Sequence, residues 1–166
     1  MKDINIRLST ASDMGIFRFW LEEDLFARIK LGFRGDDLED YFKGDYWNKI
    51  LVAGVGDEGI VGFVKYHYDS VSSYVDIKSL YVHAENRHQG VGRALLLAAE
   101  KKSLEDYNPY AWVLWTVENQ SMEQLVRSLD YEKRGTIRGL FRRRHKEFNQ
   151  AFWLKLVEEY YGDCNE

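Results

Sequence analysis

The sequence predicts an α+β domain built on a mixed, largely antiparallel sheet flanked by helices, with the element order βααβββαβαββ. Short stretches of alternating or continuous apolar residues are typical of strands. Longer stretches have helical spacing or are rich in strong helix formers. A short glycine-containing turn joins two neighbouring strands. At 166 residues the chain has the length of one domain, so we expect a single unit over residues 1–166.

The first half is expected to contain a strand, two helices and a hairpin. Residues 4–8 alternate as in a strand, and residues 9–13 offer helix N-cap candidates. Helices are expected over residues 16–29 and 36–42 because apolar residues recur there at helical spacing and glycines follow. Strands over 50–55 and 59–68 flank residues 56–58, which predicts a hairpin.

The second half is expected to continue with a strand over 74–83, a helix over 94–102 and a strand over 111–117. A helix over 120–129 and a hairpin of strands 135–141 and 148–156 complete the series. The crossover through residues 94–102 predicts one parallel strand pair.

Composition excludes several classes of protein. Hydrophobic residues make up 45% of the chain, which excludes a disordered chain. The sequence contains no long uncharged apolar run, so we expect no membrane span. The net charge of −4 disfavours nucleic acid as a partner, because binding phosphate backbones needs a concentrated basic face. The N-terminus lacks an apolar signal region, so we expect a cytoplasmic protein. Cys164 is the only cysteine, so no intrachain disulfide is expected. The sequence leaves open whether the chain forms a homodimer.

The most informative segment runs from Val82 to Ala99, where a strand end, a glycine loop and a helix start coincide. A helix N-terminus offers backbone N–H groups and a partial positive charge, and glycine lets an anion approach the backbone. Gly90 and Gly92 could instead only shape a tight connection. A dinucleotide-binding loop would need a third glycine where Leu95 stands, and a P-loop would need Gly-Lys-Ser/Thr, so neither nucleotide motif is complete.

Arg87, Gly90 and Gly92 resemble the motif of the GNAT superfamily of N-acetyltransferases, which reads Arg or Gln, two residues, Gly, one residue, then Gly or Ala. The resemblance extends over nearly the whole chain and implies a GNAT-like fold that uses acetyl-CoA as co-substrate and no metal. It implies that the main chain of the fourth strand pairs with the pantetheine arm and that the loop holds the pyrophosphate. The cofactor-binding residues implied are Leu80, Tyr81, Val82, Arg87, His88, Gln89, Gly90, Val91, Gly92, Arg93 and Asn119.

Two positions depart from the family pattern. Seven residues after Asn119, where members commonly carry a Tyr that protonates the departing thiolate, this chain has Val126. The family's following Gly-Phe pair reads Asp130-Tyr131. Because a thiol with a pKa of about 8.5 is a tolerable leaving group, the loss of the acid affects the mechanism more than the cofactor.

Amine acetylation also requires removal of a proton from an ammonium, and the catalytic candidates for that step are Asp76 and, more weakly, Glu118. Asp76 stands where relatives often have an acidic residue, and a solvated strand carboxylate is the alternative. Tyr81 is a weaker candidate because strand alternation points it away from the face of Leu80 and Val82. The four histidines show no metal-ligand spacing, so no zinc site is expected.

Three side-chain clusters bear on the acceptor. The acidic residues 36–40 lie where GNAT proteins border the acceptor site, and could attract a cationic amine or only complement a helix dipole. The basic residues 142–146 are expected in the turn of the last hairpin, where they could meet an anion or water. The aromatic residues of the first helix are expected mostly in the core, with some free to line a pocket: Phe17, Phe19, Trp20 and Phe26.

The leading hypothesis is acetyl transfer to a primary amine of a small molecule, peptide or protein. A coenzyme-A-binding sensor or interaction module that has lost turnover is the alternative, with Val126 in its favour. A nucleotide-phosphate binder is disfavoured by the missing third glycine.

Overall fold

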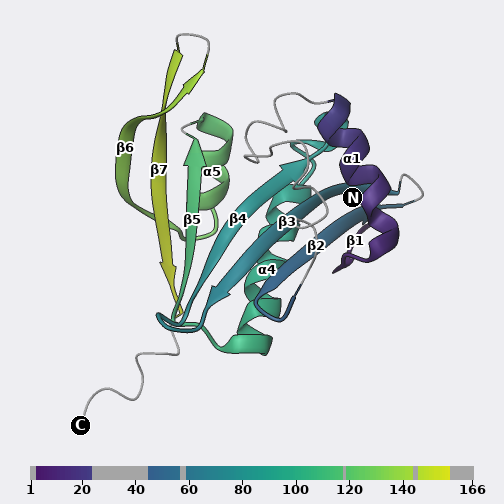
Figure 1. Ribbon diagram of the computed structural model, residues 1–166, viewed down its shortest axis with the longest axis horizontal. Coiled ribbons are helices and arrows are strands. Elements are labelled where there is room, and N and C mark those ends of the chain that lie inside the picture. Colours follow the sequence, from purple (N-terminus) through teal and green to yellow (C-terminus); the bar gives the residue numbers. More distant parts are fainter. Residues whose placement is uncertain (1–2, 24–44, 57–58, 118, 144–145, 158–166) are drawn as a thin grey trace. The chain divides into compact units, whose positions relative to one another are not determined.

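The computed structural model describes residues 3–23, 45–56, 59–117, 119–143 and 146–157 (Figure 1). The strands hydrogen-bond in the order β1-β2-β3-β4-β5-β7-β6. The β4–β5 pair is parallel, and the β1–β2, β2–β3, β5–β7 and β6–β7 pairs are antiparallel. The chain therefore has the predicted mixed, largely antiparallel α+β fold, and the parallel pair is where the crossover predicted it. Two compact units divide the chain, the first comprising residues 1–67 and 79–101 and the second residues 68–78 and 102–166.

The first unit contains β1 (Ile4–Leu8), α1 (Met14–Glu23), β2 (Asn48–Val55), most of β3 (Ile60–Asp69), the end of β4 (Tyr74–Val82) and the start of α4 (Val91–Tyr107). Phe63 of β3 contacts the rings of Phe17 and Trp20 from α1. The neighbouring Gly62 faces Leu95 of α4. Because successive residues of a strand point to opposite faces, α1 and α4 lie on opposite faces of this part of the sheet (Figure 1).

Asp13 anchors the beginning of α1, immediately after the short 3₁₀ turn Ala11–Asp13. Its carboxylate accepts two hydrogen bonds of 2.8 Å from the Arg7 guanidinium and one of 2.7 Å from the Thr10 backbone N–H. The hydrogen bonds from Arg7, and to a lesser extent those from Thr10, hold the pKa of the Asp13 carboxyl below its usual range. The predicted N-cap segment thus joins β1 to α1 through a buried carboxylate.

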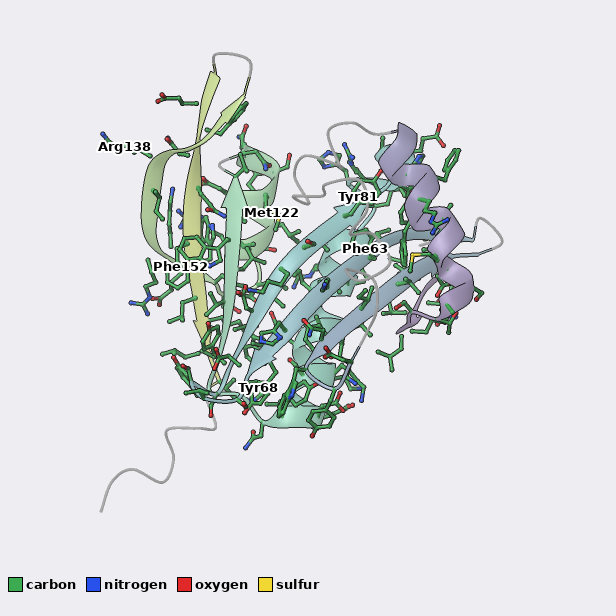
Figure 2. All side chains as sticks on the ribbon, viewed as in Figure 1. Phe63, Tyr68, Tyr81, Met122, Arg138 and Phe152 are labelled. Carbon is green, nitrogen blue, oxygen red and sulfur yellow. The ribbon has the colours of Figure 1, made fainter. Side chains whose placement is uncertain are left out.

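Aromatic side chains fill the core between α1 and the sheet. Phe17, Trp20, Phe63 and Tyr81 are all buried, and Trp20 lies 5.2 Å from Tyr81 between ring centroids. Figure 2 labels Phe63 and Tyr81, which come from neighbouring strands. The expectation that the aromatic residues of the first helix are mostly core is confirmed for Phe17 and Trp20. Phe19, which is 49% exposed, belongs to the subset that was expected to lie outside the core.

The second unit contains β5 (Ala111–Val117), α5 (Gln120–Arg127), β6 (Glu132–Arg143) and β7 (Lys146–Leu156), with the start of β4 and the end of α4. Both helical segments contact one face of its sheet. The Trp112 indole N–H of β5 donates to Ser103 Oγ of α4 at 2.9 Å, and the Arg127 guanidinium of α5 lies 5.0 Å from the Trp153 ring of β7. We call this the helix face, and Trp153 on it is fully buried.

Both ends of α5 have defined caps. The Asn119 side chain accepts a 2.9 Å hydrogen bond from the Met122 backbone N–H at the first turn. At the other end, the Tyr131 N–H donates to the Val126 carbonyl, and the Asp130 N–H donates to the Arg127 carbonyl, each at 3.1 Å. This pair of hydrogen bonds is a Schellman motif. Asp130 has a φ of 65°, so the position is left-handed, which explains why the family pattern prefers glycine there.

Within the described residues, the strands and helices lie where the sequence predicted them, and several extend further. Helix α4 runs from Val91 to Tyr107 rather than over 94–102, and β6 and β7 continue to Arg143 and from Lys146. Residues 142, 143 and 146 therefore belong to strands rather than to a turn. The second predicted helix (36–42), the end of the first beyond Glu23, and Phe26 and Cys164 lie outside the described residues. No helix in the described part of the chain is long and apolar enough to cross a membrane.

Candidate functional site

The glycine loop before α4 has backbone conformations that suit an anion. His88 and Gly90 adopt left-handed conformations with φ of 60° and 86°, and the Gly90 carbonyl accepts from the Ala94 N–H at 2.9 Å to start the helix. A Cβ built on Gly90 would meet no heavy atom within 4 Å, so it would project into open space. Backbone that turns in this way before a helix presents its N–H groups to one concave region, which suits a phosphate.

Side chains from the same segment fix the loop. Arg87 Nε donates to the Val82 carbonyl at 2.8 Å, and its guanidinium carbon lies 6.0 Å from the Tyr81 ring centroid. Gln89 Nε2 donates to the Glu85 carbonyl at 2.8 Å. Arg87 is therefore held on the end of β4 and on a ring that belongs to the aromatic core. Tyr81 packs in that core, as strand alternation predicted, and supports the loop rather than the reacting atoms.

The first turn of α4 favours an anion. It contains no acidic residue, and Val91 is buried while Arg93 is exposed. The helix N-terminus contributes a partial positive charge at the backbone N–H groups of its first residues, among them Gly92. The first unit thus brings together the predicted residues from Leu80 to Arg93 within one strand end, one loop and one helix start.

A close approach between β3 and β4 fixes the strand end that carries the loop. The Val61 carbonyl accepts from the His83 N–H at 2.8 Å. A Cβ on Gly62 would lie 2.7 Å from the Tyr81 carbonyl oxygen and 3.3 Å from Val82 Cα. Only glycine therefore allows β3 to come this near to the two residues that position Arg87.

Asp76 lies in the second unit, on β4, and it is not the solvated carboxylate that was the alternative expectation. Its exposed fraction is 8%. Lys78, two residues further on the same strand, forms an ion pair with Asp76 Oδ2. Asp76 Oδ1 is buried and accepts no hydrogen bond from a described residue. A buried carboxylate with one unbonded oxygen can accept a proton, or a hydrogen bond, from a substrate.

The other predicted site residues of the second unit that the structure describes contribute to the fold. Asn119 caps α5 through Oδ1, and its Nδ2 donates to the Val117 carbonyl at 3.3 Å. Val126, at the position of the family's tyrosine, is fully buried. Glu118 lies outside the described residues.

The remaining candidates contribute less. Among the described residues, no group of three or more His, Cys, Asp or Glu side chains could hold a metal ion. His67 Nδ1 hydrogen-bonds with Asn48 Oδ1 at 3.2 Å, and the His83 ring stacks 6.5 Å from that of Trp20. His145 and the acidic residues 36–40 lie outside the described part of the chain, as do the side chains of 142–146.

Two features of the second unit were not predicted. The first feature is the ion pair between Lys78 and Asp76. The sequence could have predicted it, since residues i and i+2 of a strand share a face. The other feature is the sheet face opposite the helices, which carries the exposed Trp115 and Ile137. The continuous apolar run of β5 gave no signal that one side of it is open.

The strand end, the loop and the helix start together form a candidate anion site in a mixed α+β sheet domain. A model of the GNAT acetyltransferase domain matches residues 46–135, more than half of the chain. The chain belongs to this family and is an acyltransferase. No curated protein sequence matches the chain.

Solved structures show the same fold at low sequence identity. NAA60 of Arabidopsis thaliana in complex with a bisubstrate analogue is 17% identical with a TM-score of 0.78, over 94% of this chain and 99% of that chain. Spermidine N-acetyltransferase of Vibrio cholerae in complex with CoA and spermine is 14% identical with a TM-score of 0.79, over 95% and 97%. The ribosomal-protein-S18-alanine N-acetyltransferase of Escherichia coli is 13% identical with a TM-score of 0.76, over 93% and 94%.

Proposed function

We propose that this chain transfers the acetyl group of acetyl-CoA to a primary amine of a small molecule, peptide or protein. The observation that carries the proposal is the loop of residues 87–93, whose left-handed residues and acid-free helix start suit a pyrophosphate. Structural relatives described with acetyl-CoA or CoA support this choice of donor. Acetyl-CoA supplies a thioester, in which a thiolate is the leaving group.

In this proposal, the loop and Asp76 have separate tasks. The backbone N–H groups of Gly92 and its neighbours, with Arg87 held by Val82, bind and orient the phosphates. Asp76 takes a proton from the acceptor ammonium, and the neutral amine nitrogen attacks the thioester carbonyl. A carbon–nitrogen bond forms and the carbon–sulfur bond breaks, and the departing thiolate takes up the second proton, which the attacking nitrogen loses as the amide forms.

A coenzyme-A-binding module without turnover is the second candidate. Val126 favours it, because a fully buried valine supplies no proton at the family's tyrosine position. We favour the enzyme because a thiol with a pKa of about 8.5 leaves without a dedicated acid more readily than an alcohol or amine would.

Thiol release from acetyl-CoA, measured with and without a panel of primary amines, tests the proposal. The enzyme releases thiol only when an acceptor is present, whereas the module stays at background with every amine. A thermal shift with acetyl-CoA tests binding separately, because a ligand at one hundred times its Kd stabilises the folded state by about 2.7 kcal/mol. Gly92→Asp should abolish this shift by placing a carboxylate at the phosphate site, and unchanged binding by that variant would rule out the loop.

A further inference from the structure

The sheet face of the second unit opposite the helix face carries a partly exposed apolar cluster, with Glu132 and Gln150 elsewhere on the same face. Residues paired across strands share a face. Asp76 pairs with Val113, and Trp115 pairs with Phe152, which in turn pairs with Gly135. Trp115, two residues after Val113, therefore lies on the same face as Asp76. We call the surface of Asp76, Val113, Trp115, Gly135, Ile137 and Phe152 the Trp115 face.

Aromatic surface dominates this face. Trp115 is 39% exposed and Ile137 is 44% exposed. The Trp115 and Phe152 rings lie 4.6 Å apart between centroids and are tilted by 36°, and Phe152 is labelled in Figure 2. A Cβ on Gly135 would meet no heavy atom within 4 Å, so the space beside Phe152 is open. Clustered exposed apolar side chains mark a binding surface more often than isolated ones do.

Asp76 gives this surface a polar end. Its Oδ1 is buried and has no hydrogen-bond donor among the described residues, and leaving a buried carboxylate oxygen unbonded is costly. In register, the Cα of Trp115 lies about 7 Å along β5 from the residue paired with Asp76, at roughly 3.3 Å per residue. An amine on Oδ1 would therefore be one short spacer away from the aromatic pair.

Lys78 restricts the charge of the ligand. Its ammonium already pairs with Asp76 Oδ2, so the pair is close to neutral. A second positive charge beside Lys78 is disfavoured, which lowers the pKa of an incoming ammonium and favours the neutral amine that can attack a thioester. A ligand with several ammonium groups gains little here, because Glu132, the other carboxylate that the register places on this face, already forms an ion pair with Arg134 at 2.7 Å.

We propose that the acceptor is a monoamine with an aromatic or bulky apolar group one short spacer from its nitrogen, bound with the amine at Asp76 Oδ1 and the apolar group against Trp115 and Phe152. This inference rests on the proposed acetyl transfer and names the substrate class of the same reaction. Asp76 is then both proton acceptor and anchor, and the Trp115 face determines specificity.

The test compares 2-phenylethylamine, ethylamine and spermidine as acceptors by thiol release. We expect 2-phenylethylamine to have the highest kcat/KM. Trp115→Ala should lower that value about three- to tenfold, as for loss of an aromatic contact, while leaving ethylamine unchanged. Trp115→Phe should restore most of it. Trp47→Ala is the matched control, since Trp47 is 40% exposed but lies in the first unit, and should change neither value.

Three outcomes would overturn the inference while leaving acetyl transfer intact. Spermidine could be the better acceptor, or Trp115→Ala could lower kcat/KM equally for both monoamines. Alternatively, Trp115→Ala could convert a dimer to a monomer in light scattering without changing acceptor preference, which would make the face a contact between copies of the chain.

If no amine releases thiol, acetyl transfer fails instead. Calorimetry of 2-phenylethylamine with the CoA-bound protein and its Trp115→Ala variant then decides the inference, and equal binding by both would refute it.

Discussion

Replacing Gly62 by alanine should disturb both the fold and the loop, because its neighbours are backbone atoms. The added Cβ would lie 2.7 Å from the Tyr81 carbonyl oxygen, a distance at which one of the strands must move. Overpacking of this kind costs about 1–3 kcal/mol. For a domain of this size, that corresponds to a fall in Tm of roughly 3–10 °C. Displacement of Tyr81 and Val82 also removes support from Arg87, so the Tm increase caused by acetyl-CoA should shrink.

Differential scanning fluorimetry with and without acetyl-CoA measures both effects in one experiment. Gly135→Ala is the control, since a Cβ there meets nothing within 4 Å, and its Tm should stay within about 2 °C of the unmodified protein. Our account of the contact between β3 and β4 is wrong if Gly62→Ala melts like Gly135→Ala. Normal acetyl-CoA stabilisation of a destabilised Gly62→Ala protein would show instead that the strand end does not support the loop.

Substitutions at three further positions probe the caps. Asp130→Gly should raise stability by about 0.5–1 kcal/mol in urea unfolding, because glycine relieves the left-handed strain at φ 65°. Asn119→Ala should cost about 1 kcal/mol while Asn119→Ser retains most of the cap, and equal losses would argue against capping. Asp13→Ala should cost about 1 kcal/mol at pH 7. The Asp13 carboxyl has a lowered folded pKa, so its contribution is full above the unfolded pKa of about 3.9 and is lost as pH falls through the folded value. The difference between the two proteins in urea unfolding should therefore disappear at low pH, and a constant difference would contradict the role of the ion pair with Arg7.

Val126 shows how far a sequence pattern can be carried into a mechanism. The pattern identified a missing proton donor, which suggested that Val126→Tyr would restore one. The structure buries Val126 completely, since α5 turns that position toward the helix face. A tyrosine there should destabilise the protein by about 1–3 kcal/mol before its hydroxyl could act. A stably folded Val126→Tyr protein with a higher acetylation rate would contradict this interpretation.

The sequence by itself determined the strands, the described helices and the loop of residues 87–93, because these depend on neighbours a few positions away. Periodicity, caps and two glycines in a fixed spacing are local properties, and they were sufficient to indicate a candidate anion site at the start of α4. The tertiary structure decided what depends on strand pairing between distant residues. Register placed Asp76 beside Val113 and Trp115 beside Phe152, and it left one face of β5 open although both faces carry large apolar residues in sequence. An exposed and a buried tryptophan have the same local pattern, and only the position of the helices on one face distinguishes them.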